Sequence, residues 1–126
     1  MLFKELQDDP LGLFLIRESR ISHVQLDSWL LSKSGIRAIS ESASMRDDKP
    51  VSKGSFSRTL HQARENAHKA IYDVLLLQYL GLLPSDMLER LVEIGNTLVM
   101  LRTGEVGYER LVEARDVLER AMSSIS

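Results

Sequence analysis

A helical pattern of apolar residues runs without interruption from Ser52 to about Leu82 and constrains the fold more than any other feature. Ser52 is a favoured N-cap residue, and about 30 helical residues would span some 45 Å. Residues 71–83 are apolar almost all round, so we predict that this second half is the buried, central helix of the core. Gly81 or the Leu83-Pro84 step is expected to end it. The stripe on one face comprises Phe56, Leu60, Ala63, Ala67, Ala70, Val74 and Leu77.

Two shorter helices are predicted before this one. The first covers residues 11–20, with Asp9 as N-cap and Pro10 in the first turn, where proline is favoured. The second begins at Ser22 and ends near Gly35. A glutamine stands three residues after Ser22, as in a capping box. The expected buried stripe of this second helix is Leu26, Trp29 and Leu30.

The remaining chain is also expected to be helical. Residues 36–45 form a serine-rich and therefore frayed helix, residues 46–50 a turn, and residues 85–104 a helix capped by Ser85 and ended by Gly104. Its inward-facing residues are expected to be Leu88, Leu91, Val92, Leu98, Val99 and Leu101. The last helix spans about residues 108–123. Together these features predict an all-α fold, a small bundle of about five helices with a long central helix over about 52–82.

Length and composition fit one domain over residues 1–126. The sequence contains no cysteine, which excludes disulfides, thiolate catalysis and cysteine-based zinc sites.

No apolar run approaches about 18 residues, so no membrane contact is expected. The first ten residues are charged and lack the apolar stretch of a signal peptide, so we expect a cytoplasmic protein.

Charge is distributed unevenly along the chain. Residues 34–69 form a positively charged part, whereas residues 70–126 carry five basic and nine acidic side chains and are expected to form an antiparallel helical part. A positive segment between negative ends is where a polyanion would bind. The alternative interpretation is an ordinary mixed-charge surface.

Combinations of residues typical of catalysis or metal binding are scarce. His61, Glu65 and His68 share a helix face, but the two histidines are seven residues apart, whereas a zinc site on a helix needs a step of about four. There is no glycine-rich phosphate loop and no nucleophile elbow. The acidic residues at 89, 93, 105, 109 and 113 lack nearby histidines. The sequence therefore predicts no enzyme activity, no cofactor and no metal.

Residues 51–64 carry the most specific motif. An aliphatic Val51 is followed by Ser52, Gly54 and Ser55, and then by Phe56, Leu60, Ala63 and Arg64. This segment resembles the recognition helix of the helix-turn-helix in region 4 of sigma factors and related bacterial and archaeal regulators. The resemblance covers about 14 residues. It implies double-stranded DNA as partner and, because such motifs usually act in pairs, a homo-oligomer, most simply a dimer.

The resemblance also implies which residues contact DNA. In that family the first turns of the recognition helix meet base edges and phosphates, and arginine and glutamine suit guanine and adenine edges. The first helix of the motif would be residues 36–45, joined by a turn in which Asp47 and Asp48 would repel phosphates. The candidate nucleic-acid-binding residues are Arg46, Lys49, Lys53, Ser55, Ser57, Arg58, His61, Gln62 and Arg64.

A second resemblance points elsewhere. Residues 56–102 are loosely similar to the four-helix-bundle proteins encoded in ribosomal-RNA intervening sequences, through Ala63-Arg64-Glu65-Asn66, the apolar run to Leu83 and the leucine-rich helix ending at Leu101. This resemblance implies a non-catalytic module for oligomerisation or protein–protein interaction. The first interpretation of the chain is a DNA-binding regulator or nucleoid-associated factor, and the second is such a module.

Overall fold

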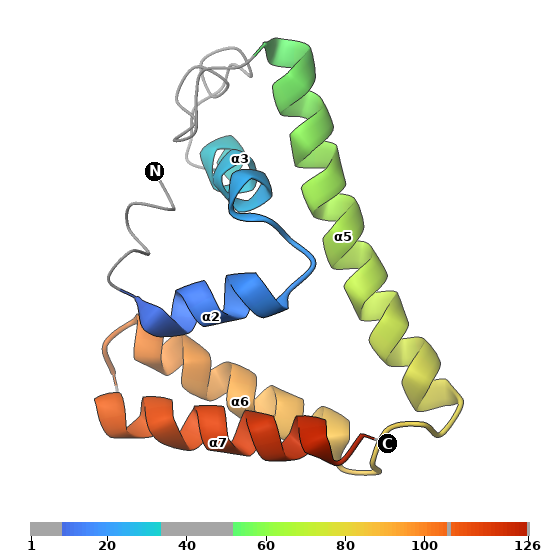
Figure 1. The fold of residues 1–126 in the computed structure, drawn as a ribbon, viewed down its shortest axis with the longest axis vertical. Coiled ribbons are helices and arrows are strands. Elements are labelled where there is room, and N and C mark those ends of the chain that lie inside the picture. Colours follow the sequence, from blue (N-terminus) through green and yellow to red (C-terminus); the bar gives the residue numbers. More distant parts are fainter. Residues whose placement is uncertain (1–8, 34–51, 106, 126) are drawn as a thin grey trace. The chain divides into compact units, whose positions relative to one another are not determined.

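The computed structural model describes residues 9–33, 52–105 and 107–125, and all regular structure in these residues is helical (Figure 1). The chain divides into two compact units, Met1–Asp73 and Val74–Ser126. The predicted all-α class is confirmed, as is the long central helix. Whether the two units act as one domain stays a prediction. The helices are α2 (Pro10–Glu18), α3 (His23–Lys33), α5 (Lys53–Tyr79), α6 (Met87–Arg102) and α7 (Tyr108–Ser123).

The first two helices begin where their caps predict. Asp9 Oδ1 accepts a hydrogen bond of 3.0 Å from the amide of Gly12, and Pro10 occupies the first turn of α2. At α3, the amide of Gln25 donates to Ser22 Oγ and the amide of Ser22 donates to Gln25 Oε1, both at 3.2 Å. This reciprocal pair is the predicted capping box. The helix α2 ends at Glu18, two residues earlier than expected, because Ser19 is extended.

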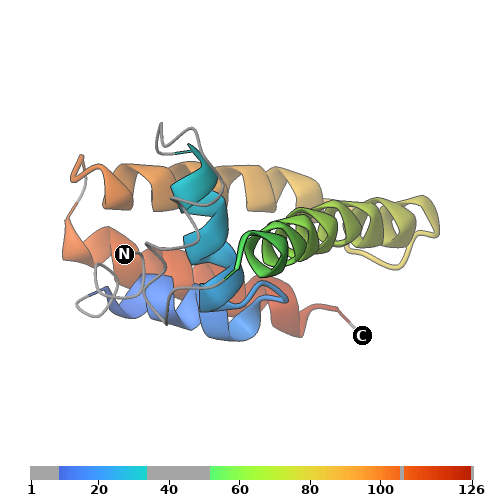
Figure 2. The same ribbon diagram turned by 90° about the horizontal axis from the view of Figure 1, so that it is seen from above.

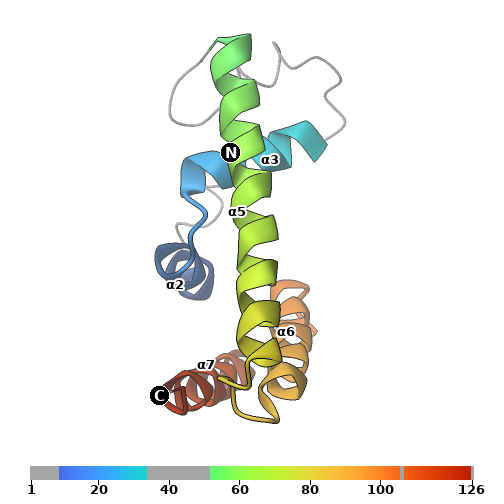
Figure 3. The same cartoon turned by 90° about the vertical axis from the view of Figure 1, so that its right-hand side faces the viewer.

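Local signals also set both ends of α5, which Figure 3 shows as one unbroken helix. Ser52 Oγ accepts from the amide of Ser55 over 3.1 Å, which confirms Ser52 as the cap. After Tyr79 the chain reverses at Gly81, whose φ of 72° suits glycine. The amides of Gly81 and Leu82 donate to the carbonyls of Gln78 and Leu77 at 3.1 and 3.0 Å, as in a Schellman motif.

The core of the first unit lies between α3 and the N-terminal half of α5. Leu31 and Phe56 are fully buried, Leu60 is nearly so, and Trp29 packs against them. The stripe predicted for α3 is wrong at Leu30, which is 40% exposed. The buried face of α3 is rotated by about one residue from the predicted stripe, because Leu31 rather than Leu30 packs against Phe56 and Leu60 of α5. This face also buries Asp27 and Ser28.

The prediction that the second half of α5 is buried all round is also wrong. One side carries the half-buried Val74 and Leu77, but the other side is exposed from Ile71 to Leu80. An apolar sequence all round a helix does not say which side another element covers. Here only one side is covered within the part of the chain that the structure describes.

The second unit contains the antiparallel pair α6 and α7, which lie side by side in Figures 1 and 2. Met87 and Ile94 of α6 and Ala114 and Ala121 of α7 are buried. The inward direction predicted for Val92 and Val99 is wrong, since both are more than 60% exposed. The buried side of α6 is therefore the one that carries Met87 and Ile94, and Val92 and Val99 lie away from it.

The predicted cap of α6 is wrong by one residue. Asp86 rather than Ser85 is the N-cap, and its carboxylate pairs with Arg90 Nε at 2.7 Å. The predicted end is confirmed: Gly104 has a φ of 78°, and the amide of Glu105 donates to the carbonyl of Met100 over 2.9 Å. The bounds of α7 match the prediction.

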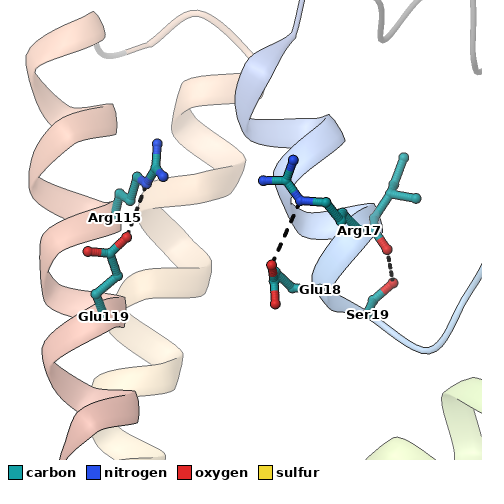
Figure 4. A network of polar contacts seen from close by, with 6 residues as sticks. Arg17, Glu18, Ser19, Arg115 and Glu119 are labelled. Atoms are coloured by element: carbon teal, nitrogen blue, oxygen red, sulfur yellow. Dashed lines mark hydrogen bonds and ion pairs between the residues drawn. The ribbon is translucent and has the colours of Figure 1, made fainter.

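Polar contacts between residues close in sequence lie on the surfaces of α7 and α2 (Figure 4). On α7, Arg115 Nε lies 3.2 Å from Glu119 Oε1, one turn further along. At the end of α2, Arg17 Nε lies 3.8 Å from Glu18 Oε1, and Ser19 Oγ donates to the carbonyl of Ile16 over 3.0 Å. Exposed pairs of this kind are typically worth about 0.2–1 kcal/mol. None of the helices within the described ranges has the length and apolar character needed to cross a membrane.

Candidate nucleic-acid interface on α5

The N-terminal half of α5 is held on one side by apolar packing. Phe56, Leu60 and Ala63 are buried on this side, and Phe56 and Leu60 share a cluster with Leu31 of α3. One turn beyond Ala63, Asn66 Nδ2 donates to Gln25 Oε1 at 3.1 Å and to the carbonyl of Arg20 at 3.3 Å. The helix is therefore fixed about its own axis, and its opposite side faces solvent.

Five of the predicted DNA-contacting residues lie on that solvent side or at its border. At about 100° per residue Arg58, His61 and Gln62 lie opposite Phe56, whereas Lys53 and Arg64 lie nearer the buried side, about 60° and 80° from Phe56. All five side chains are exposed, and they combine three permanent positive charges with an imidazole and an amide. The five are Lys53, Arg58, His61, Gln62 and Arg64.

The two serines predicted to contact DNA, Ser55 and Ser57, are less accessible to a ligand than these five residues. Ser57 is half-buried. Ser55 is also half-buried, its amide donates to Ser52 Oγ, and its carbonyl accepts from Thr59 Oγ1 over 3.0 Å. The backbone of Ser55 is thus used within the helix. Arg46, Lys49 and the expected first helix of the motif, residues 36–45, lie outside the described residues.

The face extends further along α5 than the motif indicated. His68 and Lys69 are exposed and lie seven residues after His61 and Gln62, which is two turns along the same side. The motif ends at Arg64, so only the helical period could have identified these two residues. We define the basic face of α5 as Lys53, Ser57, Arg58, His61, Gln62, Arg64, His68 and Lys69.

Negative charge on this stretch is limited to one side chain. Among residues 53–69 the only carboxylate is Glu65. Its Oε1 lies 4.0 Å from His61 Nε2, so it weakens the positive potential chiefly around His61. Four lysines and arginines against one glutamate leave a net positive surface about 24 Å long, at 1.5 Å per residue.

Other kinds of site find less support in the described ranges. No group of three histidine, aspartate or glutamate side chains comes close enough there to hold a metal ion. A hollow of about 90 Å³ lies between α6 and α7, and Arg110 and Glu113 on its wall pair at 2.9 Å. It is smaller than the roughly 300–1,000 Å³ of ordinary small-molecule sites. Its lining residues are Glu93, Ile94, Thr97, Arg110, Glu113, Ala114 and Val117.

Comparison with known proteins gives no family for the chain. No protein-family model, no curated protein and no solved structure matches it. The functional argument therefore depends on the residues and geometry described above.

Proposed function

We propose that this chain is a helix-turn-helix-like DNA-binding protein, a transcriptional regulator or nucleoid-associated factor of the cytoplasm, that contacts double-stranded DNA with the basic face of α5. The observation that supports this proposal best is the separation of the two sides of α5. One side is anchored through Phe56, while the other exposes Arg58, His61 and Gln62 to solvent, and Lys53 and Arg64 are exposed at its border.

The chemistry of the face suits a duplex. An α-helix fits the major groove, which is about 12 Å wide. Arginine can bind guanine through two parallel hydrogen bonds, and glutamine can do the same with adenine, so Arg58 and Gln62 are suited to base edges. Lys53, in the first turn, and Lys69, in the fifth, are suited to phosphates. The resemblance of residues 51–64 to a recognition helix supports the same orientation.

Electrostatics would favour the first half of α5 as the part of the chain that contacts DNA. The chain as a whole carries a net charge of −2, and residues 70–126 account for more acidic than basic side chains. Phosphates would therefore be repelled by α6 and α7 and attracted to the first half of α5. Binding is expected to be salt-dependent because it releases counterions from the duplex.

The proposal is tested by fluorescence anisotropy of a labelled duplex with three forms of the full chain. Arg58→Ala should weaken binding by roughly 5- to 150-fold, the range expected for one guanine-contacting arginine at about 1–3 kcal/mol. Arg120→Ala, which removes an exposed arginine from α7, is the matched control and should leave the affinity unchanged. Equal affinities for all three forms would contradict an interface on α5.

A second candidate function is a non-catalytic module for protein–protein interaction. It is favoured by Val92 and Val99, which are 64% and 63% exposed and lie two turns apart on one side of α6. Under this function the chain would not bind DNA at low salt, and Arg58→Ala would have no effect. The same anisotropy experiment therefore separates the two candidates.

A further inference from the structure

The solvent-facing side of α5 changes character after Lys69. From Ile71 onward the side chains on this side are large and apolar or aromatic, and each is between 52% and 87% exposed. We define these as the apolar face of α5: Ile71, Tyr72, Leu75, Leu76 and Tyr79, together with Leu80, the residue directly after the end of the helix. It directly continues the basic face along the same helix.

We propose that the apolar face of α5 binds the same face of a second copy of this chain, so that the protein forms a symmetric dimer through α5. The proposal does not depend on DNA binding. It rests on the area, the shape and the charge of this face.

The exposed area is large enough for an interface between two chains. Aromatic side chains bury about 150–250 Å² each, and the six partly exposed residues together present on the order of 800 Å². The largest apolar patch of an ordinary monomer is about 300–600 Å². A standard interface buries about 800 Å² per partner. Leaving such a face in water would be costly, whereas pairing it would contribute the usual stabilisation of apolar burial.

The face also has a shape that two copies can share. Ile71, Leu75 and Tyr79 form one ridge at steps of four, and Tyr72, Leu76 and Leu80 form the neighbouring ridge. Ridges at this spacing fit into the groove between the same ridges of a second helix at a crossing angle of about −50°. In a twofold-symmetric pair, each residue meets the same patch on its partner. The crossing point would then lie near Leu75 and Leu76.

Charge favours a second copy over a highly charged partner. No aspartate, glutamate, lysine or arginine occurs between Asp73 and Asp86. Asp73 itself is paired with Arg20 Nη1 at 2.6 Å. Two copies of the face therefore meet without placing like charges opposite each other, which is the usual obstacle to self-association. A partner with charged side chains would find no ionic complement there.

The dimer is tested by light scattering on the full chain during size-exclusion chromatography. The wild type should show twice the 14.3 kDa chain mass at micromolar concentration. Leu76→Asp should return it to the monomer with unchanged helical circular dichroism, because Leu76 is 56% exposed. Val112→Asp is the control, since Val112 is 48% exposed but lies on α7, and it should remain dimeric. If Leu76→Asp fails to fold, Tyr79→Lys at the most exposed position decides the question.

Cysteine cross-linking locates the contact, because the wild-type chain contains no cysteine. Leu76→Cys should form a disulfide-linked dimer under mild oxidation, whereas Gln62→Cys, about 21 Å further along the helix, should not. A monomer at every concentration would overturn the proposal. So would a dimer that persists in both Leu76→Asp and Tyr79→Lys. If the reduced Leu76→Cys variant is instead a monomer and its thiol reacts slowly with a thiol reagent, another segment of the same chain covers the face, and the proposal again fails.

Discussion

Asn66 Nδ2 donates a hydrogen bond to Gln25 Oε1 over 3.1 Å, and this contact joins the middle of α5 to the capping box that begins α3. The same amide group also donates to the carbonyl of Arg20. The contact spans 41 residues of sequence and lies one turn beyond the buried Ala63. It therefore helps to hold the basic face of α5 toward solvent.

Removing this contact should lower the stability of the first unit. Asn66→Ala loses about 1 kcal/mol of hydrogen bonding but gains helix propensity. Asn96→Ala, at an exposed asparagine of α6, measures the gain in propensity alone. The free energy of unfolding in urea should be about 1 kcal/mol lower for Asn66→Ala than for Asn96→Ala. Equal values would show that the contact adds nothing to stability.

Removing a buried hydroxyl from α3 should raise the free energy of unfolding, in contrast to the removal of the Asn66 amide. Ser28 is fully buried, and its Oγ has no hydrogen-bond partner in the described part of the chain. Ser28→Ala should raise the free energy of unfolding by about 1 kcal/mol, because it removes an unsatisfied polar group and improves helix propensity. The control is Ser32→Ala in the same helix, where the hydroxyl donates to the carbonyl of Trp29 over 2.7 Å and its loss offsets the gain. A destabilised Ser28→Ala would contradict the account.

Two glycines should respond oppositely to alanine. Gly81 has a φ of 72° and ends α5, so Gly81→Ala should destabilise the protein by about 1 kcal/mol. Gly95 lies within α6 with open space at the position of a Cβ, so Gly95→Ala should stabilise it by about 0.5–1 kcal/mol. Thermal unfolding followed by circular dichroism measures both. A shift of the same sign for both variants would contradict the assigned roles.

The exposed ion pair between Arg20 and Asp73 should contribute little despite its short distance of 2.6 Å. Both side chains are more than half exposed, so solvent screens their attraction. A double-mutant cycle with Arg20→Ala and Asp73→Ala should give a coupling free energy below about 1 kcal/mol. A coupling of several kcal/mol would instead give this pair a leading part in fixing α5.

The ends of most helices could be predicted from the sequence because caps act locally. Asp9, Ser22 and Ser52 accept the hydrogen bonds expected of them, and Gly104 ends α6 with a positive φ. At α6 the neighbouring Ser85 and Asp86 are both good caps, and composition alone did not distinguish them. The exposure of Arg58 could also be predicted, because the period that buries Phe56 places it on the opposite side, whereas Lys53 and Arg64 border the buried face.

Which side of a helix is covered could not be predicted, because it depends on elements distant in sequence. In α3 the stripe of Leu26, Trp29 and Leu30 is as regular as the face that includes Leu31, and only packing against α5 decides between them. In the second half of α5 both sides are apolar, so the sequence contains no signal for the exposure of Tyr79. The motif does not predict His68 and Lys69 as part of the site, because it ends at Arg64 whereas the helix continues to Tyr79.

The central claim is that the basic face of α5 binds the DNA backbone, and the salt dependence of binding tests it most directly. The measurement is anisotropy of a labelled random-sequence duplex titrated with the wild-type chain at several salt concentrations. Each phosphate contact contributes about −0.9 to the slope of log K against log salt. Phosphate contacts from Lys53, Arg64 and Lys69 predict a slope of roughly −2 to −3 per chain. No binding even at low salt would contradict the claim.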